Sequence, residues 1–169
     1  MCIDYRMLNS KTLKNTYPLP RIQECIDKLG RASNLSSIDL LSGYWQLRVA
    51  EKDVPKTAFN TRYGKHEFLV LPFGLTNALA TFQTLMNSIL WPYIDKFVLL
   101  YLDDILVYSN SEEEHLEHLQ LVFEGLRQHC MYARPTKYVF DEPNVEFCGH
   151  IVGQGVTKVL DSKVHAIKE

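Results

Sequence analysis

The sequence predicts an α+β protein in which helices pack on an antiparallel sheet. Helical stripes of apolar residues occur at 20–30, 82–90 and 111–126, and short β-like runs lie between them. These runs do not alternate regularly with the helices, as the strands of parallel βαβ units would. The chain has 169 residues, 46% of them hydrophobic, which is enough to build a continuous core.

Each predicted helix carries boundary signals. Pro20 opens the first helix and Gly30 ends it, while Pro92 ends the second. The third begins at Ser111, which forms a capping box with Glu114. We expect the third helix to bury four apolar residues: Leu116, Leu119, Phe123 and Leu126.

The predicted strands are short and are separated by turn residues. We expect strands at 2–6, 34–40, 57–61, 67–71, 97–101, 105–108, 137–140 and 145–152. Tyr63-Gly64 predicts a turn that joins the strands at 57–61 and 67–71. Leu102-Asp103-Asp104 predicts a tight hairpin between two apolar strands.

Composition excludes several classes of protein. The 18 Lys and Arg residues balance 20 Asp and Glu residues, so nucleic acid could be bound only through a local patch or a partner segment. The four cysteines show no CxxC pair and predict neither a disulfide framework nor a zinc site. The apolar runs are too short to cross a membrane and the N-terminus lacks a signal-peptide pattern, so we expect an intracellular chain without membrane contact.

Two adjacent acids, Asp103 and Asp104, stand out at the predicted hairpin tip. Aspartate is an ordinary turn residue, so both carboxylates could simply be solvated. The flanking strands are apolar on both faces, however, which favours a central buried hairpin. Carboxylates at the edge of a core repel each other and lose hydration, so they need a proton or a cation.

A third acid, Asp39, ends the strand predicted at 34–40. If that strand pairs beside the hairpin, Asp39 faces Asp103. Carboxylates without His or Cys favour Mg²⁺ or Mn²⁺ over zinc. Two such ions about 3.5–4 Å apart can clamp both oxygens of a phosphoryl transfer, so this pattern fits a nucleotidyltransferase.

The segment Tyr101-Leu102-Asp103-Asp104 resembles the YxDD box of reverse transcriptases. Four further segments resemble blocks of gypsy-type long-terminal-repeat retrotransposons, in the same order along the chain. They are Ile38–Gln46 (family pattern LDLxSGYxQ), Lys56–Phe59 (KTAF), Leu71–Ala78 (PFGLTNAP) and Cys148–His150 (LGH). The series covers nearly the whole chain.

The resemblance implies the fold of a right-hand polymerase: a palm whose antiparallel sheet packs on helices, with part of the fingers. It places partial fingers at 1–13 and 48–76, the palm at 14–47 and 77–154, and the start of a truncated thumb at 155–169. The implied activity is RNA-directed DNA polymerase, with dNTP and an RNA or DNA template-primer as substrates. A parent polyprotein would supply the missing thumb, connection and ribonuclease H parts.

The resemblance also assigns roles to residues around two metal ions, Mg²⁺ or Mn²⁺. Asp39, Asp103 and Asp104 match the metal-binding triad, and the main-chain carbonyl of Leu40 would be an added ligand. Tyr44 matches the bulky residue under the incoming sugar, which leaves no room for a ribose 2′-hydroxyl. Its alternative is an aromatic core residue. Phe73 and Gly74 match the segment that lines the nucleotide pocket.

A second group of residues matches positions that contact nucleic acid. These are Tyr101 of the YxDD box and the primer-grip hairpin Phe147, Cys148, Gly149 and His150. Lys137 matches a palm lysine proposed as general acid toward the leaving pyrophosphate, a role that needs a proton donor within reach. A lysine on a strand is more often a solvated charge.

Two other groups of side chains have competing interpretations. His115 and His118 could form a metal-binding face, but a solvated acidic helix surface is the expected state. A basic cluster in the predicted fingers either contacts template phosphates or is scattered surface charge. Its members are Arg48, Lys52, Lys56, Arg62 and Lys65.

Three departures from the family pattern leave a second function open. Leu79 stands where the family has Pro, and Cys148 stands where it has Leu. The fingers hairpin whose cations hold the triphosphate is missing. The alternative is therefore a truncated, non-catalytic retroelement remnant that acts at most as a nucleic-acid or protein binding fragment. A third possibility, an RNA-templated RNA polymerase, shares the palm chemistry but not the gypsy-like blocks.

Overall fold

The computed structural model describes residues 3–18, 21–30, 32–153 and 156–160. The chain divides into two compact units. Unit 1 comprises residues 1–17 and 42–85, and unit 2 comprises residues 18–41 and 86–169. The predicted boundaries between fingers and palm do not coincide with the boundaries between these two units. The predicted start of the thumb lies mostly outside the described residues.

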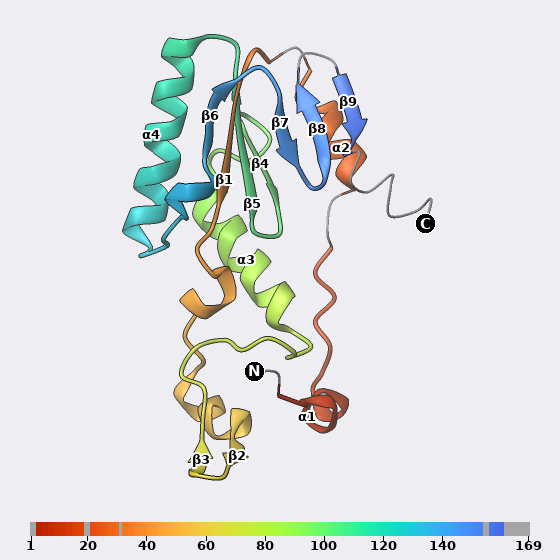
Figure 1. The fold of residues 1–169 in the computed structure, drawn as a ribbon, viewed down its shortest axis with the longest axis vertical. Helices are drawn as coiled ribbons and strands as arrows, with labels where there is room; N and C mark the ends of the chain where they lie inside the picture. The colour runs from red at the N-terminus through yellow and green to blue at the C-terminus, as the bar shows by residue number, and fades with distance from the viewer. Residues whose placement is uncertain (1–2, 19–20, 31, 154–155, 161–169) are drawn as a thin grey trace. The chain divides into compact units, whose positions relative to one another are not determined.

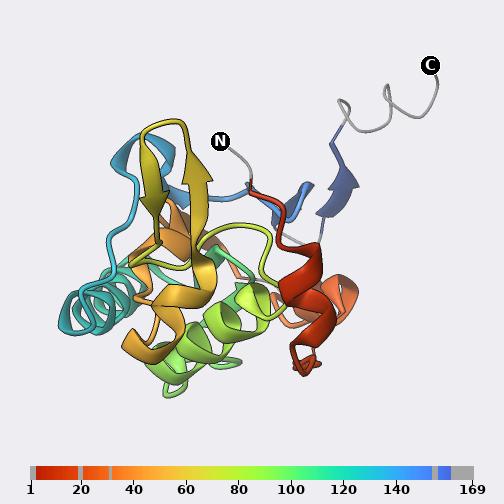
Figure 2. The same ribbon diagram turned by 90° about the horizontal axis from the view of Figure 1, so that it is seen from below.

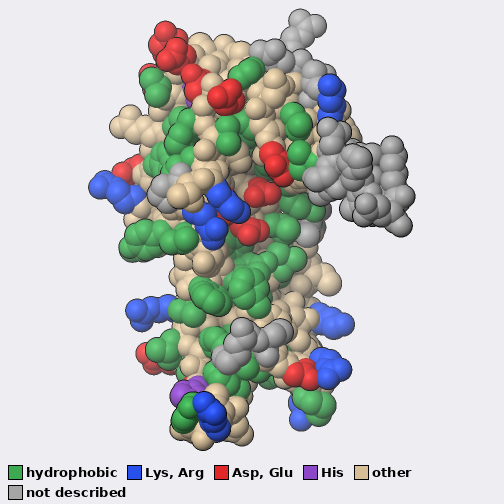
Figure 3. Space-filling model, viewed as in Figure 1, with side chains coloured by type: hydrophobic (Ala, Val, Ile, Leu, Met, Phe, Trp, Pro, Cys, Tyr) green, Lys and Arg blue, Asp and Glu red, His purple; other side chains and the backbone are tan. Residues whose placement is uncertain are grey.

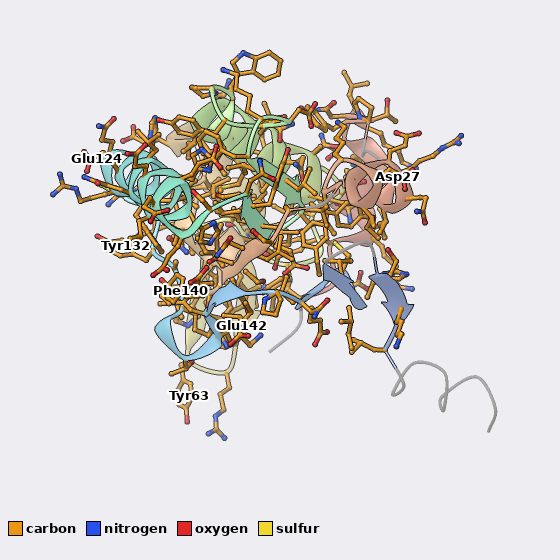
Figure 4. All side chains as sticks on the ribbon, turned by 90° about the horizontal axis from the view of Figure 1, so that it is seen from above. Asp27, Tyr63, Glu124, Tyr132, Phe140 and Glu142 are labelled. Atoms are coloured by element: carbon orange, nitrogen blue, oxygen red, sulfur yellow. The ribbon has the colours of Figure 1, made fainter. Side chains whose placement is uncertain are left out.

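Unit 1 is built from short elements (Figures 1 and 2). They are α1 (Arg6–Lys11), the 3-10 helices η1 (Gly43–Gln46) and η2 (Glu51–Thr57), the hairpin strands β2 (Phe59–Thr61) and β3 (Gly64–His66), and the first part of α3 (Ala78–Leu90). The Arg62 guanidinium lies 4.6 Å from the centre of the Tyr63 ring at the β2–β3 turn, and this ring, labelled in Figure 4, is exposed. Short helices and one two-stranded hairpin therefore make up the regular structure of this unit.

Unit 2 holds a four-stranded antiparallel sheet in the order β4-β5-β1-β6. Its strands are β1 (Asn34–Asp39), β4 (Val98–Tyr101), β5 (Asp104–Ser109) and β6 (Val139–Glu142). β6 is an edge strand and its residues are all exposed, among them Phe140 and Glu142, which are labelled in Figure 4. The central strands β1 and β5 are largely buried, and for β5 the apolar sequence predicts this.

Further elements cover this sheet (Figure 1). They are α2 (Ile22–Asp27), α4 (Glu112–Gln128), the 3-10 helix η3 (Pro135–Lys137), and a second, three-stranded sheet of β7 (Val145–Phe147), β8 (His150–Gly153) and β9 (Val156–Val159). One core cluster joins α2, β1, β4, β5, β7 and β8, and includes the fully buried Leu35 and Leu106. No helix among the described residues is both long and apolar enough to cross a bilayer.

Local signals predicted the ends of α2 and α3 and the start of α4, whereas Pro20 lies outside the described residues. Gly30 has a φ of 57° just after α2, a conformation that glycine adopts without strain. The Ser111 hydroxyl accepts a hydrogen bond from the Glu114 N–H at 3.3 Å, and the Glu114 carboxylate reaches back to the Asn110 N–H. The predicted cap of α4 is therefore confirmed, as is the α+β class.

The predictions for the N-terminal segment and for the strand after the β2–β3 turn were wrong. Asp4 accepts a hydrogen bond from the Arg6 N–H, and a helix, α1, begins there instead of a strand. The segment 69–71 pairs with 47–49 instead of with 57–61, because the Thr57 side chain bonds the Phe68 N–H. The hairpin partner of β2 is therefore the earlier strand β3.

The predicted buried stripe of α4 is confirmed at Leu126 but was wrong at Leu116. The helix buries His115, Val122 and Leu126, whereas Leu116 is 63% exposed. His115 is 1% exposed, so the expected solvated histidine surface is not observed at this position. The reason is a polar pair in the sheet: the ring nitrogens of His115 lie 2.6 Å from Ser36 Oγ and 2.8 Å from Ser109 Oγ.

The buried His115 predicts a pH dependence of stability. Burial lowers the pKa of this ring below its usual value, so the unfolded chain takes up the proton more readily than the folded one. The free energy of unfolding should therefore fall as the pH drops below about 6.5, by at most ~1.4 kcal/mol per pH unit. Urea unfolding between pH 7.5 and 5 measures this slope. His115→Gln should flatten it, and equal slopes in both proteins would contradict the assignment.

Candidate active site

The candidate site in unit 2 is built on the pairing of β1 with β5. Asp39, the last residue of β1, lies directly opposite Asp104, the first residue of β5, so the expectation that it faces Asp103 was wrong by one residue. The Asp39 carbonyl accepts a hydrogen bond from the Arg134 N–H at 2.8 Å, so the Asp39 backbone points away from β5. Asp39 and Asp104 are therefore a non-hydrogen-bonded pair, the kind in which opposing side chains lie closer together.

The third acid lies in the turn between β4 and β5. Tyr101 pairs with Asp104, which confirms the predicted hairpin and leaves Leu102 and Asp103 as its turn. Leu102 has a φ of 57°, a left-handed conformation that costs roughly 1–2 kcal/mol for a residue with a Cβ. The strained turn holds Asp103 exposed beside the half-buried Asp104.

Lys137 lies beside Asp39. It was predicted either as a general acid or as a solvated charge, and its side chain is largely exposed. It ends η3, and its Nζ lies 2.7 Å from Oδ2 of Asp39. The ammonium is thus within hydrogen-bonding reach of the acid cluster. This position fits either a neutralising partner for Asp39 or the proton donor that the family resemblance implies.

Asp104 carries the electrostatic signature of the site. Burial raises the pKa of its carboxyl group, and the charges of Asp103 and Asp39 raise it further. A hydrogen bond from the Cys148 N–H and the charge of Lys137 act in the opposite direction. A raised pKa from burial and like charges is typical of functional sites.

The hairpin predicted as a primer grip reaches this acid cluster. Phe147 pairs with His150 across the turn, and Cys148 and Gly149 both have positive φ, of 52° and 77°. Phe147 is buried, and Cys148 packs against the core cluster while its N–H bonds the Asp104 carboxylate. The turn therefore touches the candidate site directly, a link that no local sequence pattern indicated.

The carbonyl of Leu40 has a suitable direction for a ligand. Leu40 forms an isolated antiparallel bridge with Ala133, and its neighbour Asp39 gives its own carbonyl to Arg134. Successive carbonyls of a strand point to opposite sides. The Leu40 carbonyl therefore points toward the side of β1 on which β5 lies.

These donors fit a hard cation such as Mg²⁺ in type. Carboxylate and carbonyl oxygens are its preferred protein ligands, and Asp104 retains an unfavourable burial of charge that a cation would relieve. Among the residues that the structure describes, no three His, Cys, Asp or Glu side chains converge closely enough to hold an ion. Ion binding would thus require Asp39 and Lys137 to rearrange.

The residues predicted to line a nucleotide pocket lie together in unit 1. The rings of Tyr44 and Phe73 lie 5.3 Å apart, edge to face, and Tyr44 also packs on the buried Phe82 at 5.2 Å. Phe73 is 56% exposed, and Gly74 has a φ of 96°. Tyr44 is half-buried, so it is an aromatic packing residue that still presents a surface.

Charge on the surface is mixed. On the face drawn in Figure 3, acidic and basic side chains are interspersed, and neither sign forms a large patch. Two members of the predicted basic cluster have acidic partners: Lys56 pairs with Asp53, and Lys65 with Glu67. Both pairs are exposed, so they offset the positive charge of the cluster only in part.

An antiparallel sheet that places paired acids on a central hairpin defines a polymerase palm of the nucleotidyltransferase class. The family model described as reverse transcriptase (RNA-dependent DNA polymerase) matches residues 1–152. The chain belongs to this family.

Relatives support the predicted resemblance to gypsy-type elements. The RNA-directed DNA polymerase homolog of Oenothera berteroana is 56% identical over 128 residues, which cover 74% of this chain and 90% of that protein. The Pol polyproteins of transposons 297 and gypsy from Drosophila melanogaster are 44% and 39% identical and match 98% and 100% of this chain. The chain spans only 16% of each polyprotein.

Solved structures confirm the fold. The foamy viral protease-reverse transcriptase in complex with dsDNA superposes with a TM-score of 0.89 at 24% identity, covering 100% of this chain and 35% of that one. The same kind of protein in complex with an RNA/DNA hybrid gives a TM-score of 0.86 and covers 98% of this chain and 22% of that one.

The strained electrostatics of Asp104 lead to a prediction about stability. In EDTA, Asp104→Asn should raise the midpoint of urea unfolding, because the amide removes a half-buried charge that Asp103 and Asp39 repel. Added Mg²⁺ should stabilise the wild-type protein through preferential binding to the folded state, but not the variant. Asp27→Asn, at an exposed helical position, is the control. A destabilised Asp104→Asn protein would argue against this view of the site.

Proposed function

We propose that this chain is an RNA-directed DNA polymerase domain that transfers a nucleotidyl group from a dNTP to a primer 3′-hydroxyl. The observation that carries the proposal is the pairing of Asp39 with Asp104 beside Asp103 in a member of the reverse transcriptase family. Three carboxylates lie at one end of the central strands. Carboxylates are the ligands that bind the metal ions used in phosphoryl transfer. Family membership narrows this chemistry to templated DNA synthesis.

Asp39, Asp103, Asp104 and the Leu40 carbonyl would hold two Mg²⁺ or Mn²⁺ ions. When bound, such ions would offset the negative charge of the reacting phosphate and activate the attacking hydroxyl. Lys137 would leave Asp39 as an ion takes its place and would then be available as a proton donor beside the reacting groups. The main chain of Cys148 keeps Asp104 oriented through its hydrogen bond.

Tyr44, Phe73 and Gly74 would form the wall of the nucleotide pocket. The Tyr44 ring is fixed between Phe73 and Phe82, so it cannot easily yield to a bulkier sugar. A rigid ring of this kind discriminates by steric exclusion of the 2′-hydroxyl. The glycine at position 74 lets the backbone turn sharply after the exposed Phe73.

The template-primer is the expected partner. Foamy viral relatives of the same fold have been solved in complex with an RNA/DNA hybrid and with dsDNA. We assign primer contact to Tyr101 and to the turn Phe147–His150, which adjoins the acid cluster. The chain spans only 16% of a Pol polyprotein relative, and we propose that the thumb, connection and ribonuclease H parts of a parent polyprotein act with it. Because dNTPs are cellular metabolites, we place the reaction inside the cell.

Primer extension tests the proposal. With Mg²⁺, dNTPs and an RNA template, the wild-type chain should extend the primer, and Asp103→Asn should reduce extension at least about 10²-fold. Asp103 is exposed in the turn, so its substitution should leave folding intact. Binding of template-primer without extension by either protein would instead support the non-catalytic binding fragment.

Sugar discrimination gives a second test. Tyr44→Val should increase the use of ribonucleotides relative to deoxynucleotides, roughly 10-fold or more, because it removes the ring that would meet the 2′-hydroxyl. The ratio of kcat/KM for matched dNTP and NTP pairs measures the effect. Tyr63→Val, at an exposed turn of the same unit, should keep the wild-type ratio. If the ratio did not change in Tyr44→Val, the residue would be a packing residue only.

A further inference from the structure

Two asparagines link two distant segments of unit 1. The Asn9 side chain donates from Nδ2 to the Gly74 carbonyl at 2.7 Å and accepts at Oδ1 from the Thr76 N–H at 2.9 Å. The Asn77 side chain donates from Nδ2 to the Leu13 carbonyl at 2.8 Å and accepts from the Asn15 N–H at 2.9 Å. Each amide thus holds the backbone of the other asparagine's segment.

This reciprocal arrangement, which we call the asparagine clamp, satisfies backbone groups that have no strand or helix partner. A side-chain amide has both a donor and an acceptor, so one asparagine can take the place of an adjacent strand. The bonded residues are 62 to 67 positions apart along the chain. The clamp is therefore a tertiary contact that sets the position of residues 74–77.

The clamped segment contains Gly74 and directly follows Phe73. Phe73 packs against Tyr44 at 5.3 Å and against Trp45 at 6.0 Å between ring centres. Gly74 lies close to the N-terminal segment, since a Cβ built on it would come within 3.6 Å of the Tyr5 ring. Any shift of residue 74 would therefore move the Phe73 ring relative to Tyr44.

The clamp borders an open pocket. This pocket has a volume of about 230 Å³, and its lining includes Asn9, Leu75, Thr76 and Asn77. Segments packed on all sides resist displacement because neighbouring atoms are in contact. Here the segment lacks that support on one side, so the hydrogen bonds of the clamp carry more of the positioning.

We propose that Asn9 is a positioning residue for nucleotide binding, acting through its two hydrogen bonds to Gly74 and Thr76. The inference rests on the proposed polymerase function, and it adds a residue of α1 that does not itself touch the nucleotide. Asn77 connects the same two segments but bonds to Leu13 and Asn15. Its loss therefore leaves the bonds of Asn9 to Gly74 and Thr76 in place. The two asparagines should therefore contribute similarly to stability, but only Asn9 should affect nucleotide binding.

The test compares Asn9→Ala with Asn77→Ala, which removes the same number of side-chain hydrogen bonds between the same segments. Asn60→Ala, at an exposed position on β2, is the neutral control. Thermal unfolding should show similar destabilisation for the two clamp variants. In primer extension, Asn9→Ala should raise the KM for dNTP about 10-fold, with kcat and the KM for template-primer close to wild type. Asn77→Ala should stay near the wild-type KM for dNTP.

Equal effects of the two clamp variants on the KM for dNTP, or a fall in kcat alone, would overturn the proposal. If the wild-type chain extends no primer, the proposed function of the isolated chain fails, and amide hydrogen exchange decides the fate of the clamp separately. Asn9→Ala should then accelerate exchange at Thr76 but not at Asn15, and Asn77→Ala should do the reverse. Unchanged exchange at Thr76 would refute positioning by Asn9.

Discussion

The candidate active site depends on the antiparallel pairing of β1 with β5. This ladder brings Asp39 opposite Asp104, although the two residues lie far apart in the sequence. A slip of one residue would turn every side chain of β1 to the other face of the sheet, moving Asp39 away from Asp104 and displacing Leu35 and Ile38 from their buried positions on opposite faces. Burial of those two residues therefore fixes the geometry of the acids as strongly as any contact within the site.

That same register creates an electrostatic problem which neighbouring elements partly solve. Three carboxylates lie where β1 ends and β5 begins, and burial together with the charges of Asp103 and Asp39 disfavours the ionised form of Asp104. Lys137 offsets charge at Asp39, and the Cys148 N–H stabilises ionised Asp104. Neither partner lies on β1 or β5, so η3 and the β7–β8 turn must fold onto the sheet before this partial compensation is in place. A site that retains such repulsion is prepared to bind cations.

Sequence reasoning succeeded where the determining interaction is local. The hairpin around Asp103 and the cap at Ser111 follow from residues within a few positions of one another, and both were found. It failed where a distant partner decides. The buried face of α4 includes His115, because its ring contacts the hydroxyls of Ser36 and Ser109. A search for an apolar stripe cannot find such a polar contact. The family resemblance supplied the roles of the individual site residues, while the three acids alone supported a hard-cation site of the kind that a nucleotidyltransferase uses.

The two units position their residues by different physical means. In unit 2 a continuous ladder of backbone hydrogen bonds places Asp104, so single side chains matter little to its location. In unit 1 the segment that carries Phe73 has no such ladder, and its backbone relies on the side-chain amide of Asn9. A ladder tolerates the loss of one bond because its neighbours persist, whereas an isolated amide has no neighbour to replace it. Substitutions outside the acid cluster should therefore affect nucleotide binding more readily than they affect the placement of the acids.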